Sequence, residues 1–200
     1  MRTSGADKDP ARAAVDFFQV VGPLQESVSS LEKCRVPVIA AMHGLVIGAG
    51  IDLVSAADVR YCSKGTKFTI KEVDIGLAAD IGTLQRFQKI VGNDSWAREL
   101  AYTARYFTPE ESLAHGFVSK VTDTPAQCLE EAIKLAMFIA GKSPVAVTAT
   151  KLSLIYSRDH SVQAGLDHIA TLNSAMLQTD DMGVAASALM SKQKPVFPKL

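Results

Sequence analysis

The sequence has no excess of charge of either sign and very little cysteine. Lys and Arg together number 21, as do Asp and Glu, so no overall attraction to nucleic acid or to an acidic membrane surface is expected. The three cysteines are odd in number, far apart and without a CxxC pair: Cys34, Cys62 and Cys128. This argues against a disulfide framework and a thiolate zinc site, and favours a reducing compartment.

Long apolar runs are also absent, and no run approaches the roughly 18 to 20 residues that a membrane span needs. The first 15 residues lack the apolar core of a secretory signal, and Asp7 and Asp9 argue against a mitochondrial presequence. The chain of 200 residues is nevertheless 48% apolar and 21% charged, which is enough for a substantial core. The histidines show no metal-ligand spacing: His43, His115, His160 and His168.

The hydrophobic pattern predicts an α/β half followed by a purely helical half. Apolar residues recur at helical spacing from 17 to 31, where Gly22-Pro23 predicts two short helices or one kinked helix. Strands are expected at 36–42, 59–62, 67–70 and 117–121, and helices at 48–57, 81–92 and 109–116. After Asp123 only helices are expected, at 126–144, 145–157, 162–177 and 182–190.

The segment 43–54 joins an expected strand to an expected helix and reads HGLVIGAGIDLV. Gly48 and Ala49 stand where a helix start presents unpaired N–H groups, which bind negative charge. A dinucleotide loop is one interpretation, but Leu53 takes the place of its third glycine and Asp52 would repel a pyrophosphate. A tight turn, with Asp52 answering the helix dipole, is the structural alternative.

Two further acids follow Asp52 in the segment 68–87, FTIKEVDIGLAADIGTLQRF. Glu72 is expected to end a strand, and Asp80 to precede a helix. Asp80 has its own structural alternative as the N-cap of that helix. Three carboxylates brought together would raise one another's pKa, as a site that moves protons requires.

The chain resembles the crotonase, or enoyl-CoA hydratase/isomerase, superfamily. The resemblance rests on the three acids and on the blocks PVIAAMHGLVIGAGIDLVSAADVRYC, VGNDSWARELAYTARYFTPEESLAHGFVSKV and KSPVAVTATKLSLIYSRDHS. It implies an α/β fold with a ClpP/crotonase ββα superhelix core, partial and without its N-terminal strands, in residues 1–123. Residues 124–200 would form a C-terminal helical region used for oligomerisation, in a homotrimer or homohexamer.

The pattern of the acids is most similar to the dienoyl-CoA isomerase branch of this superfamily. That branch shifts 3,5-dienoyl-CoA to 2,4-dienoyl-CoA, so an acyl-CoA thioester is the expected substrate, and no cofactor or metal is expected. The resemblance makes Glu72 and Asp80 the proton-transferring pair and Asp52 a neighbour that tunes them. Ala49, with Gly48, would form the oxyanion hole for the thioester oxygen. An enoyl-CoA hydratase using Asp52 and Glu72, and a noncatalytic subunit of this fold, are the alternatives.

Relatives in this superfamily begin with a strand-helix-strand segment that supplies one oxyanion N–H and many CoA contacts. Because the sequence does not match that segment, little or no turnover is expected of this chain alone. The final residues, Pro198-Lys199-Leu200, resemble a peroxisomal SKL-type signal. A peroxisomal location is expected on that ground, with the mitochondrial matrix as the alternative.

Overall fold

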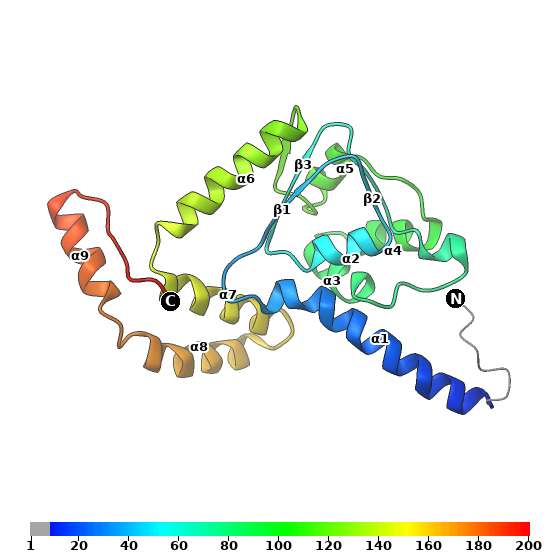
Figure 1. Ribbon diagram of the computed structural model, residues 1–200, viewed down its shortest axis with the longest axis horizontal. Coiled ribbons are helices and arrows are strands. Elements are labelled where there is room, and N and C mark those ends of the chain that lie inside the picture. Colours follow the sequence, from blue (N-terminus) through cyan, green and yellow to red (C-terminus); the bar gives the residue numbers. More distant parts are fainter. Residues whose placement is uncertain (1–8) are drawn as a thin grey trace.

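A computed structural model describes residues 9–200, and residues 1–8 lie outside the described part. The expected α/β half and helical half are both present (Figure 1). The strands are β1 Ile39–Met42, β2 Leu45–Ile47, β3 Val59–Ser63, β4 Lys67–Thr69 and β5 Lys120–Thr122. The helices of this half are α1 Pro10–Lys33, α2 Ala49–Ser55, the 3-10 helix η1 Glu72–Ile75, α3 Thr83–Ile90, α4 Asp94–Thr103 and α5 Pro109–Ala114.

The strands form two parallel sheets. One sheet has the order β1-β3-β5, with Ile39 opposite Val59, and the other pairs β2 with β4. The expected strands are confirmed with changed bounds: β1 and β4 are shorter than expected, β3 is one residue longer, and β5 begins three residues later. The elements β2, η1 and α4 are additions that the pattern did not predict. The parallel pairing of β1 and β3 around α2 confirms the expected strand-helix-strand crossover.

An aromatic cluster fills the core between the strands and the helices α3, α4 and α5. Phe68, on β4, stacks on Phe107 with ring centroids 5.2 Å apart, and Phe117 meets Phe68 edge-on at 5.8 Å. Phe87 of α3 and Trp96 of α4 complete the cluster at 5.7 Å. Edge-to-face and offset contacts of this kind add about 0.5–1.5 kcal/mol per pair beyond the area they bury, so this cluster is a rigid base for the loops above it.

The first helix, α1, continues through Pro23 as a single element, so the two-helix alternative is wrong. Asp9 caps it by accepting hydrogen bonds from the backbone N–H groups of Ala11 and Arg12. Among the described residues, Val28 is the buried residue of this helix, and the half before Pro23 is mainly exposed. Figure 1 shows that this N-terminal half projects away from the body, while the C-terminal half passes beneath α2 and α3.

The helical half consists of α6 Pro125–Ala140, α7 Pro144–Arg158, α8 Val162–Met176 and α9 Asp181–Ser191. Helix α6 packs against the β1-β3-β5 sheet, and α7 packs along α8. Figure 1 shows α8 and α9 extending away from the α/β body. In residues 9–200 no single helix has the length and apolarity of a membrane span; α6 and α7 reach them only as a pair joined by a 111° bend.

Candidate active site

The candidate site forms where β2 and β4 end side by side. Ile47 lies opposite Thr69 in the parallel register, and the Gly48 N–H donates to the Thr69 carbonyl at 3.0 Å. The two segments that leave this edge carry the predicted residues, since α2 follows β2 and η1 follows β4. The carboxyl ends of parallel strands are a common place for ligand sites because the loops leaving them diverge around a shared space.

Gly48 makes the sharp turn from β2 into α2. Its φ of 53° and ψ of −116° favour glycine, and a Cβ there would lie 3.1 Å from Oε1 of Glu72. The carboxylate of Glu72 therefore lies directly against this glycine. Because the Gly48 N–H bonds the Thr69 carbonyl, Gly48 contributes the conformation of the turn, and its place in an oxyanion hole with Ala49 stays a prediction.

Ala49 is the first residue of α2. The N–H of a first helical residue has no acceptor within its own helix, and it carries part of the positive end of the helix dipole. Ala49 is an exposed residue. The expected role of the Ala49 N–H as an oxyanion donor therefore stays a prediction.

Asp52 is fully buried, on the first turn of α2. Its Oδ1 accepts a hydrogen bond of 2.6 Å from the backbone N–H of Thr83, the first residue of α3. Its Oδ2 is buried with no hydrogen-bond partner in the described part of the chain. One oxygen of Asp52 therefore links α2 to the start of α3. The other is a buried acceptor without a hydrogen bond in the described part of the chain.

Glu72 begins the 3-10 helix η1, so the expectation that it ends a strand is wrong; β4 stops at Thr69. Its side chain is buried, and Oε2 has no hydrogen-bond partner within residues 9–200. Burial raises the pKa of the Glu72 carboxyl above its usual range, and repulsion from Asp52 and Asp80 raises it further. A carboxyl group tuned in this way is suited to accept a proton from a weak carbon acid near neutral pH.

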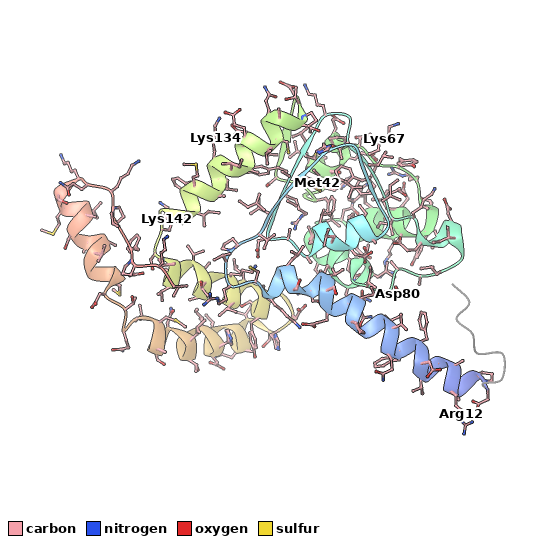
Figure 2. The ribbon with its side chains drawn as sticks, in the orientation of Figure 1. Arg12, Met42, Lys67, Asp80, Lys134 and Lys142 are labelled. Atoms are coloured by element: carbon pink, nitrogen blue, oxygen red, sulfur yellow. The ribbon has the colours of Figure 1, made fainter. Side chains whose placement is uncertain are left out.

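Asp80 lies on the loop between η1 and α3, on the side that faces α1 (Figure 2). It is exposed, and its charge is among the influences that raise the pKa of the Glu72 carboxyl. The N-cap of α3 is Gly82, without a side-chain cap, so the N-cap interpretation of Asp80 is wrong. Asp52 and Glu72 are thus buried on the two segments that leave the β2-β4 edge, and Asp80 follows on the loop after η1. Both aspartates raise the pKa of Glu72.

Two residues near this site were missed in the sequence. The Gln25 side chain of α1 donates to the Asp80 carbonyl, and Arg86 of α3 lies under Gly82. Gln25 and Asp80 are 55 residues apart in the sequence, and the contact of Arg86 with Gly82 depends on the conformation of a backbone turn. No local sequence pattern therefore indicates either residue. Within the described range, no group of three His, Cys, Asp or Glu side chains is arranged to hold a metal ion.

The parallel strands with a glycine turn, an exposed helix start and buried acids define an α/β fold with a carboxylate site. The chain matches the family Enoyl-CoA hydratase/isomerase over residues 4–199. It therefore belongs to the enoyl-CoA hydratase/isomerase family, as the resemblance implied.

Several relatives are named as dienoyl-CoA isomerases. The chain is 49% identical to "Delta(3,5)-Delta(2,4)-dienoyl-CoA isomerase, mitochondrial" of Mus musculus, over 96% of this chain and 58% of that protein. It is 47% identical to the peroxisomal enzyme of the same name from Arabidopsis thaliana, over 98% of this chain and 70% of that protein. The chain thus spans little more than half the length of its mouse relative.

The fold has a solved counterpart in an enoyl-CoA hydratase from Bacillus anthracis. The TM-score is 0.85 with 24% sequence identity, covering 96% of this chain and 72% of that one. This likeness confirms the crotonase-type fold that was expected.

Proposed function

We propose that this chain carries the proton-transfer site of an enzyme that converts 3,5-dienoyl-CoA to 2,4-dienoyl-CoA. The observation that carries the proposal is the buried Glu72, which lies against Gly48 at the start of α2 and whose pKa is raised by burial and by Asp52 and Asp80. The names of the mouse and Arabidopsis relatives support the choice of reaction.

The thioester carbonyl binds at the start of α2 in this proposal. Removing a proton from C2 places negative charge on the thioester oxygen, and the Ala49 N–H is positioned at the helix start to stabilise it. One such donor typically contributes on the order of 3 kcal/mol to the transition state. Glu72 lies beside the same turn, so it serves the C2 end of the diene.

The two acids then act at opposite ends of the diene. Ionised Glu72 takes a proton from C2, the C2–C3 double bond forms, and the double bonds at C3 and C5 become one at C4. The electron pair released at C6 takes a proton that reaches it from solvent by way of Asp80. No oxidant, reductant or water is consumed. The proton added at C6 enters from solvent at the exposed Asp80, and Glu72 returns the C2 proton to solvent.

The reaction is tested by following the absorbance of the conjugated 2,4-dienoyl thioester. The chain is assayed alone and with the part of the mouse relative that precedes the matched region fused in front of it. The fused protein is expected to isomerise 3,5-dienoyl-CoA, and Glu72→Gln is expected to lower the rate about 100-fold to 10,000-fold. Addition of water to a 2-enoyl-CoA at a comparable rate would instead favour the hydratase alternative.

Self-association belongs to the same proposal. The outward faces of α6 and α9 carry large apolar side chains, including Met137 at 71%, Phe138 at 66% and Met190 at 87% exposure. Exposed apolar area of this extent is typical of subunit contacts. A homotrimer or homohexamer is expected, and static light scattering of a monomer at micromolar concentration would contradict it.

The compartment is one of the two named for the relatives, the mitochondrion or the peroxisome. We favour the peroxisome. A fluorescent fusion imaged with and without residues 198–200 tests this choice, since a peroxisomal pattern should depend on those residues.

A further inference from the structure

A side chain of α1 bonds the loop that carries Asp80. Nε2 of Gln25 donates a hydrogen bond of 2.7 Å to the backbone carbonyl of Asp80, across 55 residues of sequence. The bond reaches the backbone of Asp80 and does not involve its carboxylate. The position of that carboxylate therefore depends on how firmly the backbone beneath it is held.

Two residues further along, the same loop rests on Arg86. Gly82 has a φ of 138°, and a Cβ at this position would overlap Nη1 of Arg86. The guanidinium of Arg86 is itself held by α1, through Oε2 of Glu32 at 3.1 Å and Oγ of Ser29 at 2.9 Å. Both side chains of the Arg86–Glu32 pair are largely buried, so this support is rigid.

The α1 residues involved share one face of the helix. Gln25, Ser29 and Glu32 follow one another at spacings of four and three, which places them in a row along an α-helix. Val28, the buried residue between them, packs toward Gly82 as well. One helix face thus contacts both Asp80 and the support beneath Gly82.

On its open side the loop borders a polar cavity of about 330 Å³, lined among others by Gln25, Asp80, Gly82 and Arg86. A polar cavity provides few packing contacts to hold the loop in place. The Gln25 hydrogen bond crosses the edge of this space and links the loop to α1 at the residue whose position matters most.

We propose that Gln25 is a positioning residue for Asp80: by holding its carbonyl, Gln25 sets the distance between the Asp80 carboxylate and Glu72. The proposal rests on the function proposed above, in which those two acids work as a pair. Gln25 itself touches neither substrate nor the transferred protons.

The test replaces Gln25 by methionine, which has similar length and no N–H donor. Gln19→Met is the matched control, because Gln19 is an exposed residue of the same helix. Carboxyl NMR titration of this chain gives the pKa of Glu72 in the unmodified protein, in each methionine variant, in Asp80→Asn and in Gln25→Met/Asp80→Asn. This readout requires no turnover.

Asp80→Asn is expected to lower the pKa of Glu72 by removing a repelling charge, and Gln25→Met to lower it partway by letting that charge retreat. In the double variant the pKa should equal that of Asp80→Asn, and Gln19→Met should change nothing. A Gln25→Met variant with an unchanged Glu72 pKa, or one whose effect adds fully to that of Asp80→Asn, overturns the positioning role.

In the fused, active protein, Gln25→Met is expected to slow isomerisation about 10-fold, the scale of a misplaced reacting group. Exchange of C2 protons with solvent, which needs Glu72 alone, should stay near the unmodified rate. Equal loss of both would overturn the proposal. If Asp80→Asn leaves the Glu72 pKa unchanged, it is the paired-acid basis of the proposed function that fails.

Discussion

Lys151→Met should destabilise the fold strongly, because Lys151 connects three segments from inside the protein. Its side chain is 5% exposed, and Nζ donates to Oδ2 of Asp58 at 2.7 Å and to the carbonyls of Leu31 and Val36 at 3.1 Å. Leu31 lies in the last turn of α1, where a cation also interacts favourably with the helix dipole. The substitution leaves a charged carboxylate and two carbonyls without this donor.

Removing one partner of a buried ion pair costs about 3–5 kcal/mol. Asp58 is 24% exposed and keeps the Val38 N–H at 2.7 Å, so the lower end, about 3 kcal/mol, is expected here. Lys89→Met is the matched control, because its pair with Asp159 has side chains 41% and 37% exposed. Exposed pairs of that kind contribute only about 0–1 kcal/mol.

Urea unfolding at pH 7 and one fixed protein concentration, followed by circular dichroism, measures both variants. The midpoint of Lys151→Met should fall far more than that of Lys89→Met, with the slope m unchanged. A loss below about 1 kcal/mol, or one equal to the control, would refute the reasoning that Lys151 is a buried connector.

Two further predictions concern the loop and the buried acid. Gly82→Ala should cost about 1–3 kcal/mol in urea unfolding, because a φ of 138° suits glycine and the new Cβ displaces Arg86; an unchanged midpoint would contradict this. Glu72→Gln should be more stable than the unmodified protein at pH 8 and nearly equal to it near pH 4. The raised pKa of Glu72 makes its ionised form costly, so the unmodified protein loses stability as pH rises through that pKa, whereas the amide does not. A stability difference that is independent of pH would contradict that assignment.

Much of the fold follows from local pattern. The continuous apolar run 36–42 predicts a buried strand, and β1 lies within it; the caps and breaks after Asp123 predict α6 to α9 within a few residues. The strand β2 was missed because its three residues stand between Gly44 and Gly48, too short a run to show periodicity. Helix α4 carries a readable signal, an Asn93 N-cap followed by buried Trp96 and Leu100.

The resemblance predicted which acids form the candidate site, which stays a prediction, but it did not predict their environments. Asp52 was expected near a helix start, yet its bond to the Thr83 N–H depends on how α2 and α3 pack. Gly48 was expected beside Ala49 in the oxyanion hole, and only the pairing of β2 with β4 shows that its N–H bonds the Thr69 carbonyl. Gln25 gave no signal because its partner is a backbone carbonyl 55 residues away.

The central claim is that Glu72 and Asp80 act at the two ends of one diene, and the fused protein carrying Asp80→Asn tests it most directly in D2O. The variant is incubated with 3,5-dienoyl-CoA, and deuterium at C2 and formation of the 2,4-diene are followed together. Continued exchange at C2, with isomerisation reduced about 100-fold or more, is the predicted result. Isomerisation at the unmodified rate would contradict it and leave Glu72 as the sole proton carrier.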